Sequence, residues 1–221
     1  MVLMGPAQSG NSSETERLLQ GVAAGNREIW GDLLARHRER LRLMVSLRLN
    51  PRLKGRIDPS DVVQEAFLTA SVQLDDYLKK RSLPFFLWLR AITGQKLIAM
   101  HRHHLGKKMR DAGREVPLYA GALPGTSSAA LAAQLLGHEL RPSQAAMRAE
   151  LEGRVREVLD SMESLDREVL VLRHFEQLSN AETAQVLGLQ ENTASKRYIR
   201  ALRRLKALFI ETPGGIQGLL P

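Results

Sequence analysis

The chain contains no cysteine among its 221 residues, which excludes disulfides and thiolate metal sites. Aromatic residues make up only 5%, and valine and isoleucine do not alternate with polar residues, so the pattern favours an all-α fold. No apolar run approaches the roughly 18 residues that a membrane span requires. Residues 1–13 lack the basic start and apolar stretch of a secretion signal, so we expect a cytoplasmic protein with no membrane partner.

Positive charge is in excess. Lysine and arginine number 32 against 24 acidic residues, which gives a formal net charge of +8. Such a balance favours a polyanionic partner, and charge alone leaves both nucleic acid and acidic membrane surfaces open. The hydrophobic content of 43% and charged content of 25% are ordinary for a soluble protein of one or two domains.

The pattern along the chain predicts two helical domains joined by a flexible linker. We expect disorder over 1–12 and a Pro/Gly-rich tail over 212–221. Residues 13–110 show helical spacing of apolar residues, with Ser13 and Glu16 predicted as the capping box of a first helix. Residues 111–142 are rich in Gly, Pro, Ala and Ser and indicate the linker, within which 129–136 has the composition of a short helix. Helical spacing resumes over 143–211.

The segment Leu165–Phe209 predicts three helices, the last two forming a helix-turn-helix. Ser179 and Glu182 have the spacing of a capping box at the start of a short helix. Gly188 is suited to the left-handed conformation of a tight turn, and a second helix begins near Gln190. A short helix, a glycine turn and a basic second helix form the arrangement that enters a DNA major groove. The competing interpretation is a solvated basic face on an ordinary bundle helix.

The basic helix provides candidate −35 DNA contacts of two kinds. The N-terminal part of a recognition helix lies deepest in the groove, so base-edge readout is assigned there and phosphate contacts are assigned along the basic face. The base-reading candidates are Glu191, Asn192, Ser195 and Lys196, and the phosphate candidates are Lys196, Arg197, Arg200, Arg203 and Arg204.

The helix that Pro84 opens starts aromatic and ends basic, which suits single-stranded DNA because bases stack on aromatic rings and cations hold phosphates. The candidates here are Lys79, Lys80, Arg81, Ser82, Phe85, Trp88, Arg90, Gln95, Lys96, His101, Arg102 and His104. Against this, Phe86, Leu89 and at least one of Phe85 and Trp88 have the spacing of core residues. The histidines do not indicate a metal, because no carboxylate or cysteine stands at ligand spacing, and no other cofactor is expected.

Asp61, Gln64 and Glu65 form an acidic patch in a basic protein. They follow Asp58 and a proline, a capping residue and a favoured first helical residue. Acid in a first helical turn is favourable with the helix dipole, so the plain interpretation is a solvated helix start. The other interpretations are enzyme carboxylates and a docking patch for a basic protein partner.

These residues carry a family resemblance. The run Asp58-Pro-Ser-Asp-Val-Val-Gln-Glu-Ala-Phe67 resembles the conserved-region-2 helix of bacterial RNA polymerase sigma factors. Residues 83–107 resemble the promoter-melting and −10-reading helix that follows, and residues 165–205 resemble the −35-reading domain of region 4. Two such domains, with a linker and no third domain between them, are typical of the small extracytoplasmic-function group. The resemblance spans about residues 14–210.

The resemblance implies a function and a set of partners. The chain would bind core RNA polymerase and direct initiation at promoter DNA by reading −10 and −35 elements. Asp61, Gln64 and Glu65 would dock on the clamp helices of the largest polymerase subunit, and Lys79–Ser82 would capture a flipped −10 base. The linker would thread toward the RNA exit channel. Gln95 stands where the family usually has asparagine, so the −10 sequence is not transferred.

Ser60 stands where the family usually has an acid, which weakens the implied polymerase affinity. Similar sigma factors are linked either with anti-sigma factors or with Ser/Thr kinases. The resemblance therefore implies one of these two kinds of protein as a further partner. Phosphate on Ser60 would restore the missing charge, and the start of a helix tolerates it.

Two other functions would share some of these sequence features. A stand-alone helix-turn-helix transcriptional regulator of the response type has a similar DNA domain, but its receiver would show alternating strands and helices, and residues 14–110 do not. An enzyme would place carboxylates at Asp58, Asp61 and Glu65, but no glycine-rich phosphate loop, nucleophile motif or metal cluster supports it. The sequence therefore predicts a protein that is not an enzyme.

Overall fold

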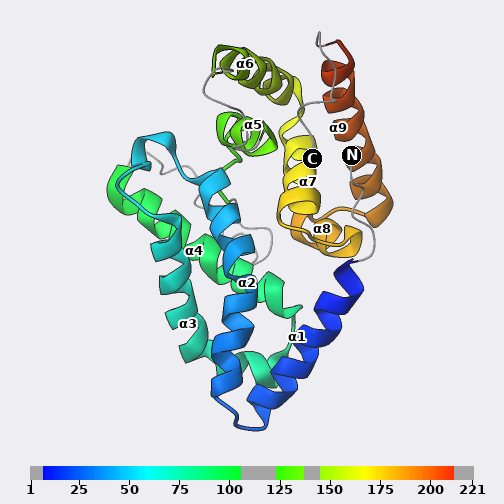
Figure 1. Cartoon of the computed structure of the whole chain (residues 1–221). Coiled ribbons are helices and arrows are strands. Elements are labelled where there is room, and N and C mark those ends of the chain that lie inside the picture. Colours follow the sequence, from blue (N-terminus) through cyan, green and yellow to red (C-terminus); the bar gives the residue numbers. More distant parts are fainter. Residues whose placement is uncertain (1–6, 106–122, 137–144, 212–221) are drawn as a thin grey trace. The chain divides into compact units, whose positions relative to one another are not determined.

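The computed structural model describes residues 7–105, 123–136 and 145–211, and all regular structure within these ranges is helical (Figure 1). The predicted all-α class is confirmed. The helices are α1 Ala7–Ala23, α2 Glu28–Arg48, the 3-10 turn Pro51–Leu53, α3 Pro59–Lys80, α4 Phe85–Leu105, α5 Ser128–Leu136, α6 Ala145–Ser161, α7 Ser164–Leu170, the π turn Val171–Phe175, α8 Asn180–Leu187 and α9 Glu191–Glu211. Within the described ranges, no helix is long and apolar enough to cross a bilayer.

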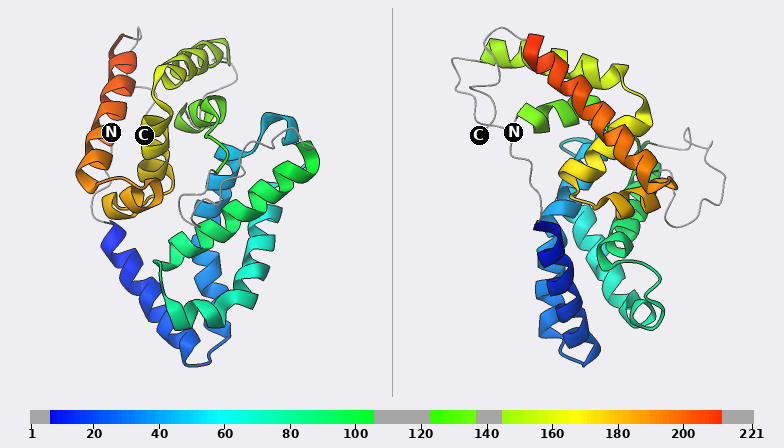
Figure 2. Two further views of the ribbon diagram at one scale, coloured as in Figure 1. Left: turned by 180° about the vertical axis from the view of Figure 1, so that it is seen from behind. Right: turned by 90° about the vertical axis from the view of Figure 1, so that its right-hand side faces the viewer.

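The chain forms two compact units, and the first contains α1 to α4. Helix α2 packs against α1, α3 and α4, and α3 also packs on α4 (Figures 1 and 2). The core of this unit includes Leu33, Leu41, Met44, Val62, Val63, Ala66, Leu89 and Leu97. The apolar residues at helical spacing on α3 therefore point inward as the sequence predicts, which leaves the acidic residues of α3 on its outer face.

The predicted helix start at Asp58 is confirmed, and Asn26 makes a similar contact just before α2. The Asn26 side-chain oxygen accepts a hydrogen bond from the backbone N–H of Glu28 at 3.1 Å. The Asp58 carboxylate accepts one from the backbone N–H of Ser60 at 2.7 Å, and a proline occupies the first helical position. Each contact satisfies a backbone donor that the helix itself leaves open.

Helix α1 begins earlier than the sequence predicts. Residues 7–12 are helical rather than disordered, so Ser13 and Glu16 lie inside α1 and do not cap it. Extending an existing helix adds one hydrogen bond for each residue fixed, so a weakly helical segment can follow a stable one. The prediction of disorder for residues 1–6 and that of a tail over 212–221 lie outside the described residues.

Four aromatic rings form a cluster where α2, α3 and α4 meet. The ring of Tyr77 stacks on Trp88 with centroids 4.3 Å apart and an interplanar angle of 20°. Phe85 contacts both rings and also Trp30. The Tyr77 hydroxyl donates to the carbonyl of Leu83 at 3.0 Å, which fixes the turn before α4. Burial raises the pKa of Tyr77 to about 12.

His37 is buried beside this cluster and is 2% exposed. Its ring lies 5.5 Å from both Phe85 and Phe86, and neither ring nitrogen has a hydrogen-bond partner among the described residues. Burial, with smaller contributions from the charges of Arg40 and Arg36, lowers the pKa of His37 to about 3. The folded protein therefore holds this imidazole neutral.

We expect this histidine to make the first unit acid-sensitive. Below pH 6.5 His37 takes up a proton in the unfolded state, whereas in the folded state it stays neutral until about pH 3. The free energy of unfolding therefore falls as the pH is lowered across that window. The slope approaches roughly 1.4 kcal/mol per pH unit, or about 2 kcal/mol between pH 6.5 and pH 5. Urea titrations at several pH values measure it. His37→Leu should flatten the profile, whereas His104→Gln, an exposed site, should leave it unchanged; equal slopes in all three would contradict this assignment.

The second unit contains α5, α6, α7, the start of α8 and α9. Helix α9 packs on α6 and α7, and α5 packs on α6 (Figure 2). Helix α5 lies within the segment predicted as a linker, and it buries Leu131, Ala132 and Leu136. Its composition of alanine and leucine gives a short helix enough apolar surface to join a core.

Candidate nucleic-acid interface

The predicted helix-turn-helix is present, with both of its local signals. The backbone N–H of Glu182 donates to the hydroxyl oxygen of Ser179 at 3.1 Å, and the backbone N–H of Ser179 donates to the Glu182 carboxylate at 2.8 Å. This reciprocal pair is the predicted capping box of α8. Gly188 adopts φ +64 between α8 and α9, a conformation that side chains disfavour. The sequence therefore fixes the turn that separates the two helices.

Helix α9 buries one face and exposes the other. Ala194, Ala201 and Leu205 are buried against the unit. The Asn180 side-chain amide donates to the carbonyl of Glu191 at 2.9 Å, which ties the start of α8 to the start of α9. The predicted base-reading residues occupy that start: Glu191, Asn192 and Lys196 are exposed, and Ser195 is half-buried. The arrangement leaves the first turns of α9 free to approach a duplex.

Two predicted phosphate contacts have a partner within the protein. The Asp166 carboxylate is 1% exposed and accepts hydrogen bonds from Arg200 Nε and Nη2 at 2.7 and 2.8 Å. Arg197 Nη1 donates to the same carboxylate at 2.7 Å and to Glu163 at 2.8 Å. Burial alone would raise the pKa of Asp166, but the hydrogen bonds and charges of Arg200 and Arg197 outweigh it and hold that pKa below its ordinary value.

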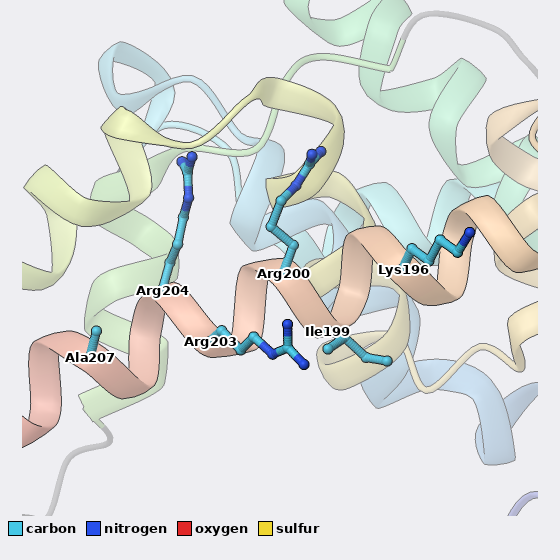
Figure 3. A pocket seen from close by; sticks show the side chains of 6 residues that line it. All are labelled: Lys196, Ile199, Arg200, Arg203, Arg204 and Ala207. Atoms are coloured by element: carbon cyan, nitrogen blue, oxygen red, sulfur yellow. The ribbon is translucent and has the colours of Figure 1, made fainter.

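This cluster fixes α9 on α7. In Figure 3 the side chains of Arg200 and Arg204 extend toward the segment between α6 and α7, and Arg204 Nη1 donates to the carbonyl of Ser161 at 3.1 Å. Arg197 is 23% exposed and Arg200 46%, so Arg200 keeps more surface for a phosphate than Arg197 does. No sequence pattern indicated a role for Asp166. Three acids, Glu163, Asp166 and Glu168, lie close together in this part of the sequence, and their spacing alone does not single out Asp166 as the partner of the α9 arginines.

Two other cations on α9, Lys196 and Arg203, differ from Arg197 and Arg200 because they have no acidic partner among the described residues. Within the described part of the chain, Lys196 and Arg203 make no ion pair or hydrogen bond through their side chains, and both are exposed. They line an open groove on α9 together with Ile199, Arg200, Arg204 and Ala207 (Figure 3). Unpaired, exposed cations on a recognition helix are the form of charge that neutralises DNA phosphates.

In the first unit, the predicted basic segment spans the last turn of α3 and the two residues after it, and all four residues are exposed: Lys79, Lys80, Arg81 and Ser82. Arg81 ends α3 in a left-handed conformation with φ 35. Its guanidinium pairs with Glu16 of α1 at 2.6 Å, a contact that the sequence did not indicate.

Four of the residues predicted to contact −10 DNA are wrong as surface contacts: Phe85, Trp88, Arg90 and His101 are all buried. Phe85 is 3% exposed because it packs in the aromatic cluster with Trp30, Tyr77 and Trp88, and Arg90 is 6% exposed. Trp88 is 9% exposed because its ring stacks on Tyr77, and so it belongs to the core. His101 is 3% exposed because its Nε2 accepts the backbone N–H of Asn50 at 3.3 Å, which joins α4 to the turn after α2. Burial lowers the pKa of His101. The remaining candidates on α4 stay at the surface: Gln95, Arg102 and His104 are exposed, and Lys96 is half-buried.

The acidic patch on α3 lies at the surface of the first unit. Asp61, Gln64 and Glu65 are exposed, and Ser60 is half-buried. The same face continues with two apolar residues, Leu68 and Val72, which are 66% and 85% exposed. Exposed apolar residues that form a patch rimmed by polar residues are a mark of protein-interaction sites.

A helix-turn-helix with a basic second helix, together with a separate helical unit that exposes an acidic and apolar face, defines a DNA-binding transcription protein. Residues 152–205 match the family described as sigma-70, region 4. The RNA polymerase sigma factor CnrH of Cupriavidus metallidurans is 33% identical over 202 residues, which cover 90% of this chain and 96% of CnrH. The extracytoplasmic-function (ECF) sigma factor SigD of Mycobacterium tuberculosis is 27% identical over 201 residues, 91% of this chain and 86% of SigD.

Comparison of the fold with solved structures also identifies CnrH as similar. The solved structure of CnrH in complex with the cytosolic domain of CnrY matches with a TM-score of 0.50 and 27% identity, covering 88% of this chain and 97% of that one. The chain belongs to the RNA polymerase sigma factors, in their extracytoplasmic-function group. Its function is promoter-directed initiation of transcription with RNA polymerase and DNA as partners, and a stand-alone regulator is not favoured.

Proposed function

We propose that the two units divide promoter recognition between them. Residues 143–211 place the start of α9 in the major groove of the −35 element. Residues 13–110 dock on the polymerase and hold the opened −10 strand, with the linker at 111–142 between them. One observation carries the −35 assignment. Lys196 and Arg203 are exposed on α9, the second helix of the capped helix-turn-helix, and neither side chain has an ion-pair partner among the described residues. Because the protein acts with polymerase on the chromosome, its proposed location is the cytoplasm.

The −35 proposal predicts a change in salt dependence. Here Lys196 is assigned to a phosphate rather than to a base edge, as Arg203 is. Lys196→Ala and Arg203→Ala should therefore each weaken promoter binding by the holoenzyme about equally for every sequence. Each should also reduce the slope of log affinity against log salt by about 1, since one fewer phosphate is neutralised. Arg156→Ala removes the same charge from α6 and is the matched control. Slopes identical to wild type in both α9 variants would remove these residues from the DNA interface.

The −10 proposal rests on the basic turn and the exposed end of α4. We assign the opened −10 strand to the exposed residues Lys79, Lys80, Arg81 and Ser82. The further candidates are on α4, where Gln95, Arg102 and His104 are exposed and Lys96 is half-buried. Single-strand binding through cations and polar groups needs no buried aromatic ring from the protein, so it is compatible with Trp88 in the core.

Docking is proposed at the outer face of α3. Asp61, Gln64 and Glu65 supply the charge and hydrogen-bonding groups for the clamp helices of the largest polymerase subunit. Leu68 and Val72 extend the face with apolar area, which gives the contact a core that acids alone would lack. The exposure of all five side chains supports this assignment.

Control by a further protein is proposed as well. CnrH has been solved with the cytosolic domain of CnrY, so an anti-sigma factor is one candidate. A Ser/Thr kinase acting on Ser60 is the other, because phosphate there would add charge to the docking face at the start of α3. If Ser60→Ala transcribes in cells as well as wild type, the kinase hypothesis fails.

A further inference from the structure

One apolar residue stands within the cationic face of α9. Ile199 is 46% exposed and is one of the three large apolar side chains that the described residues present at the surface. It lines the groove of α9 with Lys196 and Arg203, three residues before and four residues after it. Figure 3 shows Ile199 and Arg203 on the side of the helix away from Arg200 and Arg204, whose side chains extend toward the rest of the unit.

The position of Ile199 continues the row of predicted base-reading residues. Asn192, Ser195 and Ile199 are spaced by three and four residues, so they share one face of α9. A side chain on this row faces the same part of the groove as the base readers, one turn further along. The proposed −35 role assigns the cations on either side of it, Lys196 and Arg203, to phosphates, but an apolar isoleucine side chain makes no favourable contact with a phosphate.

The major groove presents one apolar group to a protein, the C5 methyl of thymine. We propose that Ile199 is a specificity-determining residue that packs against a thymine methyl in the −35 element. This inference rests on the proposed −35 role of α9. The methyl contact would give preference for thymine at one position without any hydrogen bond, and burying one methyl corresponds to about a fourfold preference.

The test separates the methyl from every other feature of the base pair. Core RNA polymerase with the full-length protein first selects duplexes from a promoter library randomised over the −35 region. Each thymine of the selected element is then replaced singly by deoxyuridine, which removes only the methyl group. The affinities of wild type, Ile199→Val and Ile199→Ala are compared on these duplexes. Because Ile199 is half-exposed, both variants should fold, and circular dichroism checks that they do.

The expected result is one thymine whose replacement weakens wild-type binding about fourfold, with the penalty kept at least in part by Ile199→Val and lost in Ile199→Ala. The inference is overturned if no thymine shows a penalty or if Ile199→Ala keeps it in full, while a selected −35 sequence would still support the proposed function. If the library yields no −35 preference at all, the −35 role of α9 fails, and the inference fails with it.

Discussion

Trp88→Ala is expected to lower the free energy of unfolding of the first unit by about 3–5 kcal/mol, the usual cost of truncating a buried tryptophan. The ring of Trp88 is 9% exposed, stacks on Tyr77 and contacts Phe85, so its loss opens a cavity where α3 meets α4. A change of this size is a large fraction of a domain's total stability. Urea unfolding followed by circular dichroism measures it.

Trp88→Phe is the control for this experiment. It keeps an aromatic ring against Tyr77 and leaves a smaller cavity than alanine does, so it should cost clearly less than Trp88→Ala. Promoter opening by the Trp88→Phe holoenzyme, followed with a fluorescent base at −10, should match wild type. The core assignment is refuted if Trp88→Ala keeps wild-type stability and selectively loses promoter opening, the behaviour of a base-stacking surface residue.

Asp166→Ala is expected to destabilise the second unit by about 2–3 kcal/mol, the range for loss of hydrogen bonds to charged groups. The carboxylate is buried and joins Arg197 and Arg200 across 31 and 34 residues of sequence. The two arginines are partly exposed and regain some solvation, so the cost is below that of breaking a fully buried pair. Because α9 would lose its link to α7, binding to a −35 duplex should fall at every salt concentration.

Glu163→Ala provides the comparison for Asp166. Glu163 pairs with the same two arginines but is 61% exposed, so its loss should cost less than about 1 kcal/mol. The pKa of Asp166 is held below its ordinary value, so its stabilisation is complete above the unfolded-state pKa and is lost as the pH falls through the lower folded-state pKa. Equal stability of Asp166→Ala and Glu163→Ala at neutral pH would contradict a structural role for Asp166.

Much of the fold could be predicted because its signals are local. The capping box of Ser179 and Glu182, the turn at Gly188 and the cap at Asp58 each depend on residues within a few positions of one another. Such signals act through backbone hydrogen bonds that the sequence specifies by itself. The start of α1 was less predictable, because extension of a formed helix needs no distinct residue.

The roles of individual side chains were harder to predict because they depend on long-range packing. Helical spacing showed that the aromatic residues of α4 share one face of the helix. Trp88 is buried because its ring stacks on Tyr77 of α3, a contact that the spacing does not reveal. His101 has basic neighbours in sequence, yet it is buried against the backbone of Asn50. Asp166 and Arg200 meet across 34 residues, a pairing for which no local spacing rule exists.

If the outer face of α3 docks this protein on RNA polymerase, reversing its charge should abolish co-purification with the core enzyme. Wild type should bind, and the double variant Asp61→Arg/Glu65→Arg should not, because two exposed acids become cations on the docking face. Asp75→Arg/Asp76→Arg, which reverses two exposed acids further along α3, is the control and should bind. Binding of the Asp61→Arg/Glu65→Arg variant as tight as that of wild type would contradict the assignment of α3 as the docking helix.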